Sequence, residues 1–369
     1  MRGNYEKQLK KCEEKLQEMR LTYIREHPGI TNLLTKIGKY HYELGRYDEA
    51  LVNYEERLRI LKKIHAGDHI NIAHAFNDAG WTLYILGRYD QARKYITESV
   101  SMCRRLFSED NLIIAGYLNN LAAVHEKLGK YDEALVIYGE SLGIRLKIHK
   151  GDNKEIADSL NNMGNVLELL ERYDDALLNH QRSLEIRQRI CFENHYDIAC
   201  SLNNIGNAYR KKGLYKEALN YYQKSLEIRK KSCLEDGPDI ANCLDNIGVV
   251  FENLKDYDQA LKYKEESLEI RRKIYKAPHP MLAISLNNIG NTFKSYKIYD
   301  KALDYLEQSL HMMEKIYPEN HQHIKIVKEN INVVNELNNK QLGERGLLST
   351  TWVVRVSNKQ EGKQQMGRG

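Results

Sequence analysis

Apolar residues recur along most of the chain at the three-and-four spacing of one helical face. Two such faces follow each other between Ala199 and Lys230. The first face comprises Leu202, Ile205 and Tyr209, and the second comprises Ala218, Tyr222, Ser225 and Leu226. This spacing predicts two amphipathic helices. Gly213 lies between them, and glycine suits the left-handed backbone that commonly ends a helix. The stretch therefore predicts a pair of antiparallel helices.

The same pattern recurs every 42 positions without an insertion. A small residue stands at Gly38, Gly80, Ala122, Gly164, Gly206, Gly248 and Gly290. A tyrosine opens each second helix, at Tyr47, Tyr89, Tyr131, Tyr173, Tyr215, Tyr257 and Tyr299. An alanine follows at Ala50, Ala92, Ala134, Ala176, Ala218, Ala260 and Ala302. A fixed period of this length predicts an array of stacked helix pairs.

The array predicts an all-α solenoid of seven helix pairs over residues 31–320, in which each pair buries its apolar face against its neighbours. Residues 4–26 read as one charged helix before His27, Pro28 and Gly29 break it. We interpret residues 1–30 as an N-terminal capping helix, and the alternative is a short piece of coiled coil. Residues 321–340 predict a C-terminal capping helix. Residues 341–369 lose the helical period and predict a disordered tail.

The turns and linkers between the helices also repeat. The turn glycines are Gly45, Gly87, Gly129 and Gly213, while Glu171, Lys255 and Lys297 occupy the matching sites. Those three turns either take another geometry or hold a left-handed non-glycine residue at a cost of about 1 kcal/mol. The linkers between repeats carry His69, Asn111, Asn153, His195, His279 and His321. We expect these residues to cap the next helix or close the turn, with Pro238 and Pro280 fixing its first residues.

Basic residues close the second helices, and Arg145, Arg187, Arg229 and Arg271 recur at the same step. A binding stripe is one reading of this series. The other is that cations in a last turn complement the helix dipole and pair with surface acids, namely Glu185, Glu227 and Glu269. The second reading is the one we expect.

Composition narrows the class of protein. The formal net charge is +5, from 56 basic and 51 acidic residues that are interleaved, which is unlike the concentrated basic patch of a nucleic-acid binder. No apolar run reaches the roughly 18 residues of a membrane span, and the first residues lack the apolar centre of a signal peptide. The six cysteines form no Cys-x-x-Cys pair. We therefore expect a cytoplasmic protein that binds no nucleic acid, metal or cofactor and inserts into no membrane.

The repeat resembles the tetratricopeptide repeat. Leu202, Gly206, Tyr209, Ala218, Tyr222 and Ser225 stand where that family has its large and small signature residues. The 42-residue unit, with the phrases SLNNIGN, YDEAL and SLEIR, is most similar to the kinesin light chain variety. The resemblance implies a right-handed superhelix whose first helices line a concave groove. It also implies a scaffold or adaptor that holds an extended peptide of a partner protein in this groove.

The resemblance further implies which residues face the groove. Three places before the small residue stand Asn77, Asn119, Asn161, Asn203, Asp245 and Asn287, and directly after it stand Asn165, Asn207 and Asn291. Four and five places after it, Arg210, Lys211 and Lys294 lie beside Glu126, Glu168 and Glu252. An asparagine amide offers donors and acceptors to a peptide backbone whatever its side chains are. The neighbouring Asn120, Asn162, Asn204, Asn246 and Asn288 match a framework position and are assigned to packing. Simple solvation of the groove asparagines is the alternative.

No motif for catalysis is present: there is no phosphate loop, no His-Glu-x-x-His and no nucleophile elbow. Two alternatives to the scaffold remain open. The tail around Trp352 could mediate self-association or autoinhibition, or the chain could be the sensor array of a larger signalling protein. We expect a monomer or a weak homodimer.

Overall fold

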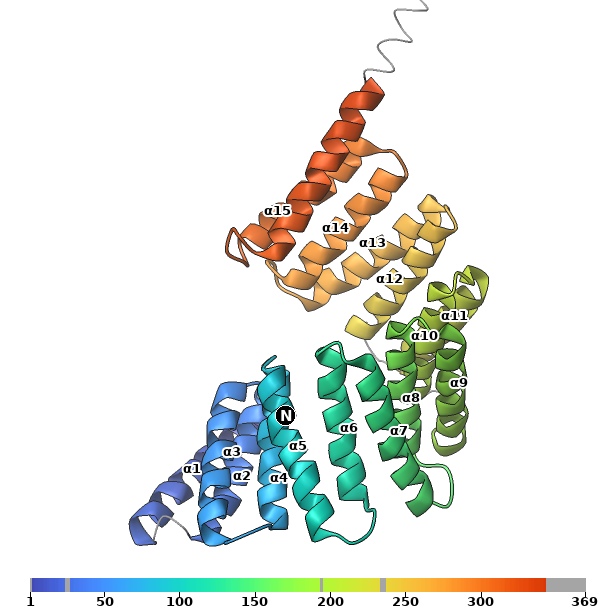
Figure 1. The fold of residues 1–369 in the computed structure, drawn as a ribbon. Helices are drawn as coiled ribbons and strands as arrows, with labels where there is room; N and C mark the ends of the chain where they lie inside the picture. The colour runs from blue at the N-terminus through green and yellow to red at the C-terminus, as the bar shows by residue number, and fades with distance from the viewer. Residues whose placement is uncertain (1, 24–26, 193–194, 233–236, 343–369) are drawn as a thin grey trace, which may run out of the picture. The chain divides into compact units, whose positions relative to one another are not determined.

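The computed structural model describes residues 2–23, 27–192, 195–232 and 237–342. It divides into two units, Met1–Glu193 and Asn194–Gly369. Within the described residues the secondary structure is helical throughout, and consecutive helices pack as antiparallel pairs (Figure 1). The predicted all-α solenoid of helix pairs is therefore confirmed. The tail that begins at residue 343, including Trp352, lies outside the described residues.

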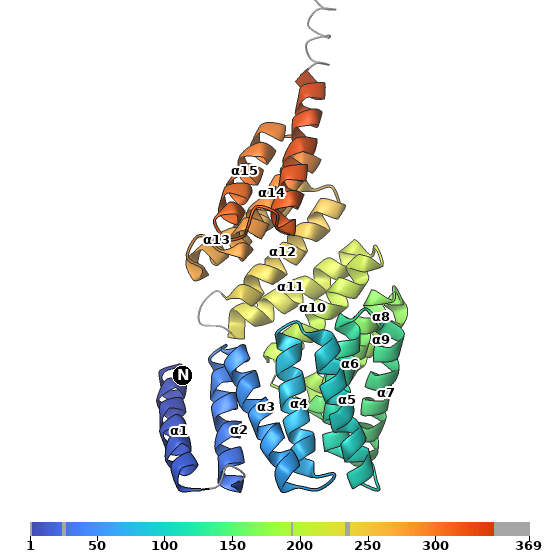
Figure 2. The ribbon, with the colours of Figure 1, turned by 60° about the vertical axis from the view of Figure 1, so that its left-hand side comes forward.

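Unit 1 contains nine helices among its described residues. They are α1 (Arg2–Thr22), α2 (Pro28–Glu43), α3 (Tyr47–Ile64), α4 (Ile70–Ile85), α5 (Tyr89–Leu106), α6 (Leu112–Lys127), α7 (Tyr131–Ile148), α8 (Lys154–Leu169) and α9 (Tyr173–Ile190). Figure 2 shows α1 to α4 side by side. Unit 2 contains α10 (Tyr196–Lys211), α11 (Tyr215–Ser232), α12 (Pro238–Asn253), α13 (Tyr257–Ile274), α14 (Pro280–Ser295), α15 (Tyr299–Glu314) and a last helix over residues 322–342. Even-numbered helices are the first helices of the pairs, and odd-numbered helices from α3 onward are the second.

The turns inside the pairs have the left-handed backbone that their glycines predict. Gly45, Gly87, Gly129 and Gly213 have φ between 73° and 83°. Glu171, Lys255 and Lys297 have φ of 58°, 63° and 64°. The alternative of a left-handed non-glycine residue is thus confirmed for these three turns, and each carries the steric cost of a Cβ in that region.

The linker residues cap the first helices, as the sequence predicts. The Nδ1 atom of His69 accepts a hydrogen bond from the backbone N–H of Asn71 over 3.1 Å, and Asn111 Oδ1 accepts from Ile114 N–H over 3.0 Å. Asn153, His195 and His279 cap α8, α10 and α14 in the same way. Each cap satisfies a backbone donor that the helix leaves without an intrahelical partner. His27 does this for α2, so the first repeat begins at Pro28, three residues before the expected Thr31.

The small residue of each first helix contacts the second helix of its own pair. A Cβ atom built on Gly206 would lie 2.7 Å from the Tyr222 ring, and one built on Gly38 would lie 2.6 Å from the Tyr54 ring. This close approach explains why six of the seven repeats hold glycine at this position, while the third repeat holds the next smallest residue, Ala122. A buried serine adds a second tie: Ser225 Oγ donates to the backbone oxygen of Ala199 over 2.7 Å. The same bond recurs at Ser99, Ser141, Ser183, Ser267 and Ser309.

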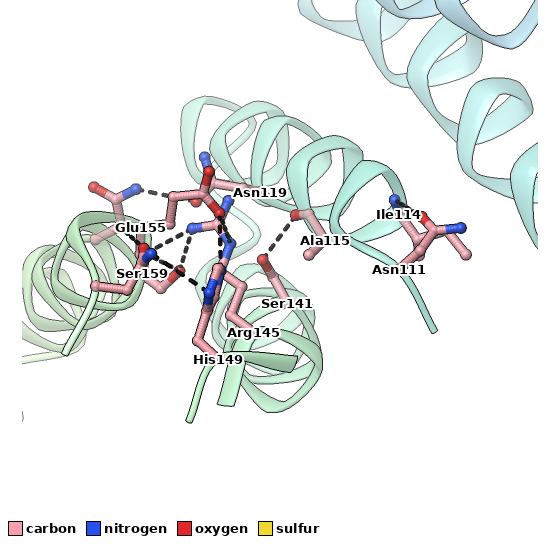
Figure 3. A network of polar contacts seen from close by, with 11 residues as sticks. Asn111, Ile114, Ala115, Asn119, Ser141, Arg145, His149, Glu155 and Ser159 are labelled. Atoms are coloured by element: carbon pink, nitrogen blue, oxygen red, sulfur yellow. Dashed lines mark hydrogen bonds and ion pairs between the residues drawn. The ribbon is translucent and has the colours of Figure 1, made fainter. Parts of the chain in front are cut away.

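The arginine series is buried, which corrects the expected surface pairing. Arg145, Arg187, Arg229 and Arg271 are each at most 7% exposed. Figure 3 shows Arg145 of α7 reaching α8, where its Nη1 atom donates to the backbone oxygen of Glu155 and to Ser159 Oγ, both over 2.7 Å. The expected acids pair elsewhere, Glu227 with Lys231 and Glu269 with Arg272. These arginines therefore connect second helices to the first helices packed against them. They do not form an exposed basic surface.

One helix packs against the first repeat and another packs against the last. Leu9 and Leu16 of α1 are buried in one cluster with Ile30 and Leu34 of α2. At the other end, the helix over residues 322–342 buries Ile324, Val327 and Val334. Helix α1 spans Arg2–Thr22, a little short of the expected 4–26, and residues 24–26 lie outside the described part. None of the helices in the described residues has the length and apolar character needed to cross a membrane.

Candidate functional site

The predicted groove asparagines lie half-buried on the first helices and are tied to the neighbouring repeat. In unit 1, Asn120 Nδ2 donates to Asn77 Oδ1 over 3.0 Å, and Asn162 Nδ2 donates to Asn119 Oδ1 over 3.2 Å. In unit 2, Asn246 donates to Asn203 over 3.2 Å and Asn330 donates to Asn287 over 3.0 Å. We call these bonded pairs the asparagine ladder. The residues assigned to packing, Asn120, Asn162 and Asn246, thus hold the adjacent groove residues in place.

The ladder fixes which atoms of its acceptor asparagines remain available. The Oδ1 atoms of Asn77, Asn119, Asn203 and Asn287 each accept one bond from the next repeat. Within the described parts of the chain, their Nδ2 groups are bonded to no acceptor. Each such group carries two N–H donors whose direction is set by the bond at Oδ1. The result is an oriented donor on each of four first helices, α4 and α6 in unit 1 and α10 and α14 in unit 2.

The asparagines that directly follow the small residue differ in which hydrogen-bonding groups they present to a ligand. Asn165 is half-buried on α8. Asn207 Oδ1 accepts from the Tyr222 hydroxyl over 2.7 Å, and that hydroxyl accepts from Arg210 Nε over 3.4 Å. The Oδ1 atom of Asn291 is buried and has no hydrogen-bond partner among the described residues. A buried unpaired acceptor is costly, so it marks a point where a donor from a ligand would be favourable.

One predicted groove residue, Asp245, is committed to an internal ion pair. Its Oδ2 atom lies 2.6 Å from Nη1 of the buried Arg271. Two further acids expected at the groove are also paired: Glu168 with the buried His180 over 3.1 Å, and Glu252 with the buried Lys264 over 2.5 Å. His180 and Lys264 stand where other repeats place the tyrosine that packs against the small residue, as Tyr222 packs on Gly206. Glu168, Asp245 and Glu252 are therefore part of the packing.

The ion pairs of Asp245 and Glu252 determine the net charge of the predicted groove residues on the first helices of unit 2. Because Asp245 and Glu252 are neutralised by cations of α13, they do not offset Arg210 and Lys294. Arg210 and Lys294 are both half-buried on first helices, and neither makes an ion pair among the described residues. The uncompensated charge contributed by these predicted positions is positive.

Unit 1 carries an aromatic pocket that the sequence-based selection missed. A cavity of about 270 Å³ is lined by Tyr42, Asn77, Asp78 and Trp81, among others. Trp81 Nε1 donates to the Tyr42 hydroxyl over 3.1 Å. The Trp81 ring also stacks on Tyr84 with centroids 4.5 Å apart. Trp81 directly follows Gly80, as Asn165 follows Gly164, so the same positional rule identifies it.

Asp78 adds a charged group to this pocket. Its Oδ2 atom lies 2.7 Å from Nη1 of the buried Arg57. Burial raises the pKa of the Asp78 carboxyl above its usual value, and the Arg57 guanidinium partly opposes this effect. Lys39 and Glu43 also line the pocket, so it combines aromatic walls with amide and charged groups, a mixture that suits a side chain with an apolar body and a polar end.

Comparison with protein families identifies the repeat. The family model described as tetratricopeptide repeat matches residues 29–105, 113–189, 155–231, 197–263 and 239–315. These matches cover most of the chain. A search among curated proteins gave no match.

Solved structures with the same fold include kinesin light chain-like proteins. BtubC (BKLC) from P. vanneervenii is 20% identical with a TM-score of 0.55, over 63% of this chain and 95% of that chain. A putative kinesin light chain of nearly identical repeats from Podosopora anserina is 15% identical with a TM-score of 0.50, over 56% and 99%. A tetratricopeptide repeat protein from Parabacteroides merdae ATCC 43184 is 15% identical with a TM-score of 0.56, over 82% and 98%. At these identities the likeness concerns the fold alone.

Proposed function

The chain belongs to the tetratricopeptide repeat family, and from that premise we propose that it is a non-catalytic scaffold or adaptor which binds an extended peptide segment of a partner protein along its first helices. Tetratricopeptide repeats typically mediate protein–protein interaction. The proposal includes a cytoplasmic location, a monomer or weak homodimer, and end caps formed by α1 and by residues 322–342.

The observation that carries the proposal is the asparagine ladder. A peptide in extended conformation presents backbone carbonyl groups along its length, and each needs a donor when it leaves water. The Nδ2 groups of Asn77, Asn119, Asn203 and Asn287 offer donors that are already oriented by the bonds at Oδ1. Because these side chains are held before binding, little side-chain entropy is lost on contact.

The spacing of the rungs is compatible with an extended chain. Packed helices lie about 8–10 Å apart, and an extended peptide rises about 3.3 Å per residue. Rungs on adjacent repeats, such as Asn77 and Asn119, would therefore meet the peptide about three residues apart, and Asn203 and Asn287, which lie two repeats apart, about six residues apart. Donors at this interval bind backbone, so side-chain selectivity has to come from other groups on the same helices.

Two features supply this selectivity. In unit 2, Arg210 and Lys294 favour acidic side chains, because the acids beside them are already paired. In unit 1, the pocket between Tyr42 and Trp81 favours a side chain with an apolar body. We infer that a segment bound to unit 2 contains an acidic stretch and that a segment bound to unit 1 contains a large apolar residue.

The experiment is a selection of random peptides on the full chain, followed by affinity measurement with fluorescence anisotropy. The double variant Asn119→Ala with Asn203→Ala removes one rung from each unit. We expect its Kd for the selected peptides to rise at least tenfold, because two sets of backbone contacts are lost.

The matched control is Asn220→Ala, which removes an exposed asparagine from the second helix α11. Its Kd should equal that of the wild type. Circular dichroism establishes that all variants are folded. If the double variant binds as tightly as the control, the peptide does not lie along the ladder and the proposal is wrong.

A further inference from the structure

An ion pair recurs between the second helices and the linkers of unit 1. Arg105 at the end of α5 binds Asp68, with Nη2 to Oδ1 at 3.0 Å. Lys147 of α7 binds Asp110 at 2.9 Å, and Arg189 of α9 binds Asp152, with Nη2 to Oδ1 at 3.0 Å. In each case the acid stands 37 residues before the base. The repeat thus places a linker carboxylate opposite the basic residue of the following second helix.

The seventh repeat keeps the base and lacks the acid. Lys315 follows directly after α15 and occupies the same register as Arg189, three repeats further along. The residue 37 positions before it is Pro278. In the part of the chain that the structure describes, Lys315 has no ion-pair partner. A cation is therefore left where three other repeats hold a carboxylate against it.

A cavity of about 350 Å³ occupies this place in unit 2. Its walls are apolar and are formed by Leu268, Leu282, Leu286 and Met312, together with Ala277 and Pro278. Arg272, Gln308, His311 and Lys315 complete the lining, so none of the lining residues is acidic. Arg272 is already bonded to the exposed Glu269 over 2.7 Å, which leaves Lys315 as the principal charge offered to a ligand.

We propose that this cavity binds a small amphipathic carboxylate, whose carboxylate group pairs with Lys315 where three other repeats pair an aspartate with the matching base, and whose apolar chain lies among Leu268, Leu282 and Leu286. The site shares no residue with the asparagine ladder and is independent of peptide binding. The chain's own tail does not suit the cavity, because residues 343–369 hold five basic and two acidic residues and would repel Lys315.

The volume limits the size of the ligand. A cavity of this size lies near the lower end of the range for small-molecule sites, about 300–1,000 Å³. At roughly 30 Å³ for each water-sized group, the cavity has room for about twelve non-hydrogen atoms. An eight-carbon carboxylate has about ten such atoms and fits within this limit, so octanoate is the probe of choice.

Three probes of equal chain length separate charge from hydrophobicity: octanoate, octan-1-ol and octylammonium. Binding to the full chain is followed by titration calorimetry and by the methyl NMR signal of Met312 in protein labelled at its eight methionines. We expect octanoate to bind saturably, to shift the Met312 signal, and to bind at least tenfold tighter than octan-1-ol. Octylammonium should bind most weakly. Binding without a Met312 shift would place the ligand elsewhere and overturn the assignment.

Two variants test the missing carboxylate. Lys315→Gln should bring the affinity for octanoate to within about threefold of that for octan-1-ol. Pro278→Asp should weaken octanoate at least tenfold, because the introduced carboxylate would itself pair with Lys315 as Asp152 does with Arg189. Lys301→Gln, on α15 and outside the cavity lining, is the control and should bind octanoate as the wild type does. If Lys315→Gln retains the tenfold preference, the proposal is wrong.

Discussion

Asn120 Nδ2 donates a hydrogen bond to Asn77 Oδ1 over 3.0 Å, and so joins the first helices of two successive repeats. The bond has two effects at once. It fastens α6 to α4, and it turns the Asn77 amide so that its own N–H groups remain available. A residue assigned to packing and a residue assigned to binding are thus one structural unit, repeated at Asn119, Asn203 and Asn287.

Loss of the Asn120 side chain should weaken peptide binding indirectly, because Asn120 orients Asn77. In Asn120→Ala, Asn77 keeps its side chain but loses the bond that orients it. We expect peptide affinity to fall about threefold to tenfold, equivalent to about 0.7–1.4 kcal/mol. Titration of a selected peptide measures this. An effect as small as that of the exposed control Asn220→Ala would show that orientation of the rung is unimportant.

The same substitution should have opposite effects at two glycines. In Gly206→Ala the new methyl group would lie 2.7 Å from the buried Tyr222 ring, so we expect a loss of about 1 kcal/mol. In Gly116→Ala on α6 the methyl group meets no atom within 4 Å, and higher helix propensity should stabilise the protein by about 0.5–1 kcal/mol. Urea unfolding measures both. Equal signs would contradict the close contact at Gly206.

The turns with a left-handed lysine should respond to glycine. Lys255 has φ of 63°, so Lys255→Gly removes a steric cost of about 1–2 kcal/mol and adds a smaller entropic one. We expect a net gain of up to about 1 kcal/mol in the free energy of unfolding. Gly213→Ala, at φ of 83°, makes the reverse change and should be destabilising. If neither variant changes the free energy of unfolding, backbone strain does not contribute to the stability of these turns.

The buried Arg271 should be strongly coupled to Asp245. Arg271→Met leaves the Asp245 carboxylate, which is 20% exposed, without its cation at 2.6 Å. We expect a cost of about 3 kcal/mol, and a much smaller cost when Asp245→Asn is added. A double-mutant cycle by urea unfolding gives the coupling. Additive effects would show that Asp245 is free to act at the groove, as the sequence had suggested.

The linker ion pairs should contribute to acid sensitivity. The Arg189 guanidinium lowers the pKa of Asp152 below its usual value of about 3.8. A depressed pKa means that the stabilisation is present above the usual pKa and is lost as the pH falls through the lowered one. The melting temperature of Asp152→Asn should therefore fall less steeply than that of the wild type below about pH 4. Parallel curves would contradict this contribution.

Trp81 offers a direct signal of peptide binding in unit 1. The chain has two tryptophans, Trp81 and Trp352, so Trp352→Phe leaves Trp81 as the single reporter. A ligand side chain that enters the pocket should exclude water from the indole and shift its emission to shorter wavelength. Trp81→Phe should bind the same peptide more weakly. Unchanged emission at saturation would exclude this pocket as a contact.

The repeat made much of the fold predictable from sequence. The turn at Gly213, the caps at His69 and Asn111 and the small position at Gly206 each follow from a local backbone requirement that recurs every 42 residues. Trp81 was predictable too, because it occupies the position of Asn165. The asparagine pattern does not include it, because its side chain is aromatic.

Other features depend on contacts between distant residues. Arg271 lies at a helix end, where a cation commonly faces solvent, and nothing local shows that it turns inward to Asp245. The pairing of Glu252 likewise requires Lys264 at the tyrosine position of the second helix. The net charge of the predicted groove residues could not be derived from the first helices alone. The cations that neutralise Asp245 and Glu252 lie on the second helix α13.

The most direct test of the central claim maps where a selected peptide lies. A photo-crosslinking amino acid is placed at Asn165 or Asn207, beside the ladder, and in separate variants at Asn179 or Asn220 on second helices, before irradiation with labelled peptide. The account predicts cross-linked product from Asn165 and Asn207 and none above background from Asn179 and Asn220. Products from the second-helix positions alone would contradict peptide binding along the first helices.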